Sequence, residues 1–504
     1  MLLLLTVLGI VLFTMLRSPL KDDVAWLLYV ARRWLAGREL YVDVVEVNPP
    51  LIVWISAIPI WLAGVLGIDA QYTAIPFFVA IVLGCAWWTA NLLQGSGKLF
   101  EDRLPVFAAI GTVLLVVPAG DLGQREHLLV AAILPYLALF ARSLDGDRSA
   151  LRVSLIAGVL AGLGCALKPR YAGVFVVLEG VALLHGMNPF RAKPLAAGFT
   201  MLAYAGLVAL FCPAYLRRAV PLALALYGAT DVPLRHLVVD SLRLMFGQAV
   251  ALALWWSRRH RAPEGNLMLT LVVFAITSTA ICFMDGKDWF YHRLPATIAT
   301  ILALLCWAAS VLVHRRPADR RAVLPAAVAG IAFVVFLVAA FQRLEPQVAL
   351  AVEPEQDTVV KLEHLIRKQK ARTYIAFSEW IALGFPVVNN TGVAWASRFD
   401  SMWALKGELW RVHFDPVAAK EWPIRHWVAH DFIAGCPDIA VVDTREGVVN
   451  YVGVLSASDP AFARAWSRYR QIAAFDGLVV YRRGTAGCID PWVAAEAPPA
   501  IDSR

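Results

Sequence analysis

The stretch NLMLTLVVFAITSTAICFM at residues 266–284, followed by the polar DGKDWFYHR at 285–293, decides the fold of this chain. The first stretch carries no charge and is long enough to cross the hydrocarbon core of a bilayer as one α-helix. A second apolar run begins at once, at 294–313. The pattern predicts two membrane spans joined by a polar loop. Further apolar runs occupy approximately 1–16, 51–68, 71–93, 104–119, 127–141, 153–167, 171–185, 195–215, 243–256 and 322–341.

The composition of the whole chain agrees with a membrane protein. Of its 504 residues, 59% are hydrophobic and 17% are charged, whereas a soluble domain carries roughly 25% charged residues. This deficit of charge excludes a soluble enzyme, a disordered scaffold and a coiled coil. The sequence predicts a polytopic α-helical membrane protein.

The net charge of +8 comes from 46 Lys and Arg against 38 Asp and Glu. The basic residues gather in short loops between apolar runs, such as 258–261 and 314–316. This distribution is typical of cytoplasmic loops under the positive-inside rule. We therefore predict no nucleic-acid partner.

Loop charge predicts about eleven spans with the N-terminus inside. The run 1–16 lacks a basic start and a small-residue cleavage site, so we expect a retained first helix. The polar loops 18–50 and 120–126 are both expected outside, yet three apolar runs separate them. One of 51–68, 71–93 and 104–119 is therefore expected to be re-entrant or to cross only halfway.

From Arg343 onward charged residues return and the long apolar runs end. This change in composition predicts two domains: a membrane body at 1–342 and an outside α/β domain at 343–504. Short β-rich runs at 374–377, 439–442 and 478–481 are interspersed with helical stretches at 359–370 and 460–469. The residues from Thr485 onward are predicted to form a loose tail.

Cys436 precedes the predicted strand 439–442 and Cys488 follows the predicted strand 478–481. If the two strands are antiparallel neighbours, the sulfurs lie at the same end and a disulfide is possible. If they are parallel, the sulfurs lie at opposite ends. Both a bridge and two unpaired thiols remain open, with the unpaired thiols slightly favoured.

The first predicted outside loop reads KDD at 21–23, VAWLLYVARRWLAG at 24–37, RELYVD at 38–43 and VVEVNPP at 44–50. Its middle is amphipathic, with Trp26 and Trp34 on one side and Arg32 and Arg33 on the other. Such a helix is expected to lie in the membrane interface with its aromatic side in lipid.

The whole string, with two acids, an amphipathic helix, G-x-x-L-Y-x-D and N-P-P, resembles the first periplasmic loop of C-type (GT-C) glycosyltransferases. The closest likeness is to bacterial aminoarabinose and protein O-mannosyl transferases. The resemblance implies an enzyme of the bacterial inner membrane that takes a sugar from a polyprenyl-phosphate carrier. It implies a GT-C-like body, a periplasmic C-terminal domain and contact with membrane lipid, and leaves the acceptor unknown.

In that family an aspartate of this loop is the catalytic base. The matching position is Asp23, with Asp22 as the alternative. A carboxylate with an ordinary pKa is ionised at neutral pH and can accept a hydroxyl proton.

The second predicted outside loop reads DLGQREH at 121–127. Asp121 and Glu126 fit a second acid that, in the family, helps to place the acceptor or a metal. Arg125 and His127 could instead contact a phosphate, since arginine offers a planar fork of donors. A structural cluster of salt bridges is the alternative.

Two further loops carry cations. Lys168 and Arg170 lie at a predicted outer face, where the leaving polyprenyl phosphate would need fixed positive charge. Snorkelling from helix ends is the alternative. Loop 216–242 holds Tyr227, Arg235 and His236, and by resemblance it would be a loop that closes over the donor. It has no diagnostic spacing and fits a surface loop equally well.

The cluster 285–293 resembles the family's K-x-W/F-x-Y-H-x-x-P stretch, with Pro295 as its proline. Lys287, His292 and Arg293 are the expected partners of the carrier phosphate. An aromatic belt with its usual cations is the alternative.

The chain has no P-loop and no Rossmann glycine pattern, which favours a lipid-linked donor over a nucleotide sugar. No metal ligands are assigned and no cofactor is expected with certainty, although a divalent cation is possible. The rival class is a transporter or flippase of lipid-linked sugars, which predicts inverted repeats and intramembrane charges.

Overall fold

The computed structural model describes residues 1–147, 149–260, 264–314, 323–415, 421–484 and 488. The chain divides into two compact units. The first comprises Met1–Ser18, Gln71–Phe211 and Asp231–Val352, and the second comprises Pro19–Ala70, Cys212–Thr230 and Glu353–Arg504. The predicted tail from Thr485 lies, except for Cys488, outside the described residues.

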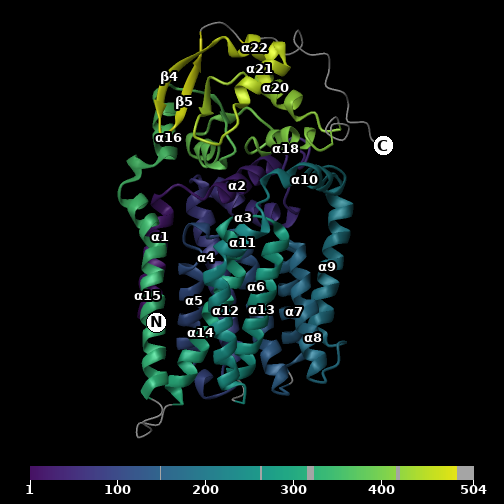
Figure 1. The fold of residues 1–504 in the computed structure, drawn as a ribbon, viewed down its shortest axis with the longest axis vertical. Coiled ribbons are helices and arrows are strands. Elements are labelled where there is room, and N and C mark those ends of the chain that lie inside the picture. The colour runs from purple at the N-terminus through teal and green to yellow at the C-terminus, as the bar shows by residue number, and fades with distance from the viewer. Residues whose placement is uncertain (148, 261–263, 315–322, 416–420, 485–487, 489–504) are drawn as a thin grey trace. The chain divides into compact units, whose positions relative to one another are not determined.

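The first unit is a bundle of long helices that lie side by side (Figure 1). Short helical turns connect some of them at the bundle ends. The helices are α1 (Leu2–Arg17), α4 (Ala70–Leu93), α5 (Arg103–Val116), α6 (Arg125–Leu144), α7 (Leu151–Leu167), α8 (Ala172–Leu184), α9 (Ala192–Phe211), α11 (Leu234–Asp240), α12 (Leu242–Arg258), α13 (Glu264–Asp285), α14 (Leu294–Val313) and α15 (Val323–Val352). The turns are η1 (Lys98–Phe100), η2 (Ala119–Asp121), η3 (Pro169–Tyr171) and η6 (Phe290–Arg293).

Glycines bring α7 and α9 into close contact. A Cβ atom on Gly158 would lie 2.4 Å from the carbonyl oxygen of Lys193, and one on Gly162 would lie 2.7 Å from that of Ala197. Gly164 meets α6 in the same way, because its Cβ would lie 3.1 Å from that of Ala132. Small residues at such positions let helix backbones approach closely in lipid.

Within the described residues, six helices are long and apolar enough to cross a membrane, or seven if one bent pair is counted as a span. The predicted count of about eleven is therefore not established. Of the three runs whose crossing was in doubt, α4 has 24 residues and passes this test. The helices of the other two, α3 (Pro50–Leu66) and α5, have 17 and 14 residues.

The second unit combines helices with a five-stranded sheet. Helix α3 begins at an N-P-P sequence, where Pro50 needs no hydrogen-bond partner for its nitrogen. The remaining helices are α2 (Asp22–Leu35), η4 (Tyr215–Ala219), α10 (Val220–Leu226), η5 (Tyr227–Thr230), η8 (Pro354–Gln356), α16 (Thr358–Lys368), η9 (Ile381–Leu383), α17 (Val387–Thr391), α18 (Trp403–Val412), α20 (Ile424–Gly435), α21 (Tyr451–Ser458) and α22 (Pro460–Trp466). The strands are β1 (Thr373–Phe377), β2 (Ala394–Trp395), β3 (Ile439–Asp443), β4 (Tyr469–Phe475) and β5 (Leu478–Arg483).

The sheet has the strand order β2-β1-β3-β5-β4. Strand β1 is parallel to β2 and β3, while β5 is antiparallel to both β3 and β4. The three predicted strands coincide with β1, β3 and β5. The predicted helix 460–469 is too long, because α22 ends at Trp466 and Tyr469 begins β4.

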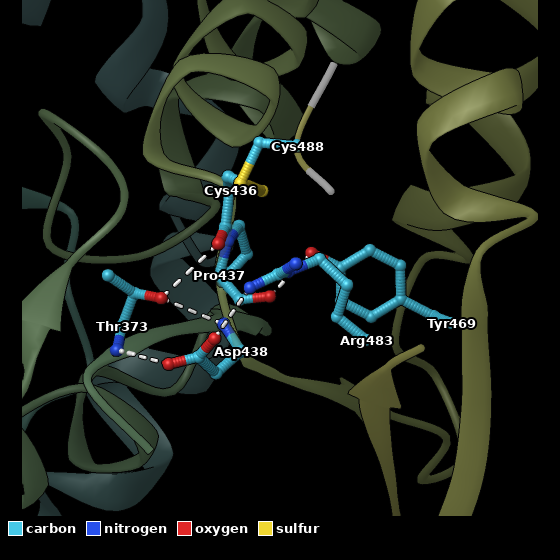
Figure 2. The surroundings of a disulfide bond; sticks show 7 residues. All are labelled: Thr373, Cys436, Pro437, Asp438, Tyr469, Arg483 and Cys488. Atoms are coloured by element: carbon cyan, nitrogen blue, oxygen red, sulfur yellow. Dashed lines mark hydrogen bonds and ion pairs between the residues drawn. A yellow bond between two sulfur atoms is a disulfide. The ribbon is translucent and has the colours of Figure 1, made fainter. Parts of the chain in front are cut away.

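Cys436 and Cys488 form a disulfide (Figure 2), so the expectation of two unpaired thiols was wrong. The antiparallel pairing places Ile439 opposite Arg482, which brings the start of β3 and the end of β5 together. The two Cα atoms are 5.8 Å apart. Neighbouring contacts hold the turn: Thr373 Oγ1 donates to the Cys436 carbonyl oxygen at 3.2 Å, and Arg483 donates to Asp438 at 2.8 Å.

Replacing both bridged cysteines by serine should lower the free energy of unfolding of this unit by about 4 kcal/mol, because the bridge restricts a long loop in the unfolded chain. Denaturant unfolding of the purified chain measures the change. Reduced wild type is the matched control and should show the same loss. Rapid alkylation of both thiols in denaturant without reductant would contradict the bridge.

The predicted boundary between domains at 342 and 343 lies inside α15, which continues to Val352. The second compact unit resumes at Glu353 and also contains two earlier segments, Pro19–Ala70 and Cys212–Thr230. The change in charge density near Arg343 therefore occurs before the helix ends.

Candidate functional site

Four helix ends in the first unit bring together a group of charged side chains. Lys168 and Arg170 follow α7, Glu126 lies in the first turn of α6, Asp285 ends α13, and His292 lies in η6 before α14. We call these five residues the Lys168 cluster. The cluster joins residues up to 166 positions apart (126 to 292) in one place.

The ammonium group of Lys168 is the centre of this cluster. Its Nζ lies 2.7 Å from Glu126 Oε1, 2.6 Å from Asp285 Oδ2 and 3.0 Å from His292 Nδ1. Arg170 reaches the other oxygen of Asp285 at 2.5 Å. Lys168, Glu126, Asp285 and His292 are buried, whereas the side chain of Arg170 is 57% exposed.

The charges of the cluster almost cancel. Two carboxylates face one ammonium and one guanidinium. His292 Nδ1 is within reach of both Lys168 and Asp285, the latter at 3.2 Å, so it accepts from the ammonium when deprotonated and donates to the carboxylate when protonated. The second carboxylate oxygen of Glu126 is buried and has no hydrogen-bond partner within the described residues. It is therefore a buried acceptor that no described residue satisfies.

Asp121 does not join the Lys168 cluster. Its Oδ2 accepts from Arg343 at 3.3 Å, and the guanidinium of Arg343 lies 3.7 Å from the ring centre of Phe290. Arg125 precedes Glu126 at the start of α6 and is half-buried. The second predicted outside loop thus sends its two acids to different partners.

His127 was proposed as a phosphate ligand, and this proposal was wrong. The ring is fully buried, its Nε2 lies 2.8 Å from the carbonyl oxygen of Leu114, and its Nδ1 accepts from the backbone of Gly123. Gly123 has φ of 90°, and a Cβ there would lie 2.7 Å from the Phe78 ring, so the position requires glycine.

The other cations predicted at 285–293 have acidic partners of their own. Lys287 is buried and pairs with Asp231 at 2.5 Å, although burial lowers the pKa of its ammonium. Arg293 pairs with Asp288 at 2.7 Å and donates to the carbonyl oxygen of Asp240. Both residues are therefore engaged with neighbouring loops.

The predicted substrate loop 216–242 is divided between the two units. Arg235 and His236 are exposed at the start of α11 in the first unit. Tyr227 lies in the second unit, where its ring meets that of Trp403 edge-on at 5.1 Å.

Asp22 and Asp23 begin α2 in the second unit. Asp22 Oδ1 accepts the backbone N–H of Asp23 at 3.0 Å and lies 3.2 Å from the ammonium of Lys21. Asp22 thus has a local structural role at the helix start.

The expectation that α2 lays its aromatic side in lipid was wrong for Trp26. This side chain is buried, packs edge-on against Phe385 at 4.8 Å between ring centres, and donates to Glu46. Trp34 alone of the predicted pair is partly exposed. The apolar face of α2 is therefore covered mainly by protein.

Asp400 joins Asp23 and Glu46 as a third acid of the second unit. Burial and, to a smaller extent, repulsion from Glu46 and Asp23 together raise the pKa of Asp400 to about 8. Asp400 is therefore mostly protonated at neutral pH.

Sequence reasoning did not select Asp285, Glu46 and Asp400 as site residues. The first two lie within polar stretches that the sequence had marked, 285–293 and 44–50, so their position was a usable signal. Asp400 stands in SRFDSM at 397–402, a stretch without any pattern that points to a site.

The described residues contain no group of three or more His, Cys, Asp or Glu side chains arranged to hold a metal ion. In the Lys168 cluster, the ammonium takes the position between two carboxylates that a cation would occupy.

No family model and no curated protein matches the sequence. Among solved structures, the chain is similar to the crystal structure of ArnT from Cupriavidus metallidurans bound to undecaprenyl phosphate. The TM-score is 0.51, the identity is 11%, and the match covers 95% of this chain and 97% of that chain. The likeness shows that this chain has an ArnT-like fold.

Proposed function

We propose that this protein is a glycosyltransferase that moves a sugar from a polyprenyl-phosphate carrier to a hydroxyl group of a lipid, glycan or protein. The observation that carries the proposal is the Lys168 cluster, in which cations and an acid with a free oxygen meet at the ends of membrane helices. The ArnT-like fold supports it, because that neighbour holds undecaprenyl phosphate.

In the proposed reaction Asp23 accepts the proton of the acceptor hydroxyl. The acceptor oxygen then bonds to the anomeric carbon from the face opposite the carrier. The bond between that carbon and the phosphate oxygen breaks, and its electron pair leaves with the polyprenyl phosphate. The configuration of the sugar is therefore inverted.

The leaving phosphate gains negative charge, which cations in a water-poor site stabilise. We assign this role to Lys168, Arg170 and His292, with Arg125 at the edge of the site. Since Glu126 and Asp285 neutralise Lys168 in the resting pairs, an incoming phosphate competes with these carboxylates. Arg170 offers the most accessible charge, because more than half of its side chain is exposed.

The remaining predicted residues take secondary roles in the proposal. Glu126 and Asp121 help to place the acceptor. Lys287 and Arg293 support the phosphate from neighbouring loops. Tyr227, Arg235 and His236 belong to the loop that closes over the donor.

We further propose that the protein lies in a bacterial inner membrane with the C-terminal domain, 343–504, on the periplasmic side. The Cys436–Cys488 disulfide supports this side, since such bonds persist in oxidising compartments. We infer that α3 is the apolar run that does not fully cross. It packs on α2 within the compact unit that also holds the sheet.

The rival function is a transporter or flippase of lipid-linked sugars. It calls for charges near the middle of the membrane, along a substrate path. The Lys168 cluster instead consists of residues at or next to helix ends. This position favours chemistry at one face of the membrane.

The purified protein should transfer sugar when supplied with a panel of polyprenyl-phosphate sugars and a mixture of envelope acceptors. Release of free polyprenyl phosphate and labelling of an acceptor measure the reaction. A nucleotide sugar without the lipid carrier should give no product. Movement of a fluorescent lipid-linked sugar across vesicles, with no transfer on either side, would favour the transporter.

A further inference from the structure

A second polar pocket lies at the end of the bundle opposite the Lys168 cluster. The 17-residue α7 separates the two ends by about 25 Å. The pocket has a volume of about 570 Å³ and lies where α6 ends and α7 and α9 begin. Its polar lining includes Ser143, Ser149, Ser154, Asn188, Arg191 and Lys193, together with the acid Asp147.

Lys193 is the decisive residue of this pocket, because it is a buried cation. Only 4% of the residue is exposed. Its Nζ donates to Ser143 Oγ at 2.8 Å and lies 5.6 Å and 6.0 Å from the ring centres of Tyr136 and Phe140. None of its contacts within the described part of the chain is an ion pair with a carboxylate.

The acids near Lys193 are engaged elsewhere. Asp147 pairs with Arg142, which donates from its Nε at 2.7 Å. Glu179 pairs with Arg191 and accepts from the hydroxyl of Tyr136 at 3.1 Å. The two pairs cancel, so Lys193, when protonated, gives the described residues of the pocket one positive charge in excess. A buried unpaired charge is costly, and an anion in the pocket would offset that cost.

Neutral donors complete a lining that suits a phosphate group. The hydroxyls of Ser149 and Ser154 lie 2.7 Å apart, and Asn188 is exposed beside them at the pocket rim. Large apolar side chains are exposed around the same helix ends: Leu151, Leu184, Phe190 and Leu195 are between 52% and 87% exposed. In a membrane such side chains contact acyl chains.

We propose that this pocket binds the phosphate head group of an anionic diacyl phospholipid, with its acyl chains along the exposed apolar residues. Basic pockets between membrane helices bind such head groups. The site is separate from the proposed catalytic centre. It makes the stability of the bundle depend on the lipid composition of the leaflet it faces.

The test uses the full chain purified in neutral detergent and titrated with phosphatidylglycerol. Thermal unfolding and native mass spectrometry report binding. Phosphatidylglycerol should raise the melting temperature of the wild type and remain bound, whereas phosphatidylcholine should not. Lys193→Met should weaken the apparent affinity for phosphatidylglycerol about tenfold or more, since a hydrogen bond from a charged group is lost.

Lys98→Met is the matched control. Lys98 is an exposed lysine in η1, and it should leave the affinity for phosphatidylglycerol unchanged. If Lys193→Met does not fold, Ser149→Ala combined with Asn188→Ala alters only accessible positions and should also weaken binding. Equal affinity in the wild type and in the folded pocket variants would overturn the proposal.

Two further outcomes would also overturn it by naming another ligand. Equal stabilisation by inorganic phosphate would indicate a site for a soluble anion. Displacement of phosphatidylglycerol by undecaprenyl phosphate at equal concentration would indicate a site for a carrier lipid.

Discussion

Asp23→Asn should reduce kcat for sugar transfer by about 100- to 10,000-fold, the usual contribution of a general base. Asparagine keeps the shape of the side chain but cannot accept the hydroxyl proton. Donor affinity and thermal stability should remain near those of the wild type, because little volume changes. Initial rates with a polyprenyl-phosphate sugar and unfolding curves in the same detergent measure these effects.

Asp22→Asn and Asp400→Asn are the controls. Asp22 is occupied by Lys21 and by the backbone of Asp23, so its variant should retain most of the activity. Since burial raises the pKa of Asp400 to about 8, its neutral variant resembles the state already present at neutral pH. Wild-type rates in both Asp22→Asn and Asp23→Asn would show that neither aspartate of this loop is the general base.

Lys168→Met should have the largest effect on stability of any single change considered. Removal of the ammonium leaves Glu126 and Asp285 facing each other in a buried site, which costs about 3–5 kcal/mol. The same change should abolish donor binding if Lys168 contacts the carrier phosphate. Unfolding curves and binding of a labelled polyprenyl phosphate measure the two effects.

A triple variant separates these two roles of Lys168. Lys168→Met combined with Glu126→Gln and Asp285→Asn removes the repulsion and should recover most of the lost stability. Donor binding should remain absent. Arg170→Ala is a milder probe, because its exposed ion pair contributes about 1 kcal/mol or less, so weaker donor binding there reports the phosphate contact. Wild-type donor affinity in the triple variant and in Arg170→Ala would show that Lys168 and Arg170 do not bind the donor phosphate and have only a structural role.

The gathering of the Lys168 cluster was only partly predictable. The sequence placed Glu126, Lys168, Arg170 and His292 in polar loops between apolar runs, and loop charge predicted that these loops share one face. The sequence did not indicate that Lys168 lies between Glu126 and Asp285, or that Asp121 pairs with Arg343. Those pairings depend on which helix ends meet and on the rotation of each helix.

The disulfide illustrates the same division. The positions of Cys436 and Cys488 beside two β-rich runs could be read from the sequence, but the relative direction of the strands could not. Parallel neighbours would have held the sulfurs apart, and the antiparallel pairing of β3 with β5 brought them together.

The sequence alone determined the features that depend on residues close together along the chain. Apolar runs of membrane length, the glycines that let α7 and α9 touch, and the β-rich runs of β1, β3 and β5 are local patterns, and local patterns specify secondary structure and burial. The tertiary structure decided which charges cancel: Lys168 against two acids, Lys287 against Asp231, Arg343 against Asp121. It alone left Lys193 without a carboxylate in the described structure, because Coulomb interactions act over a few ångströms between side chains that the chain order does not place together.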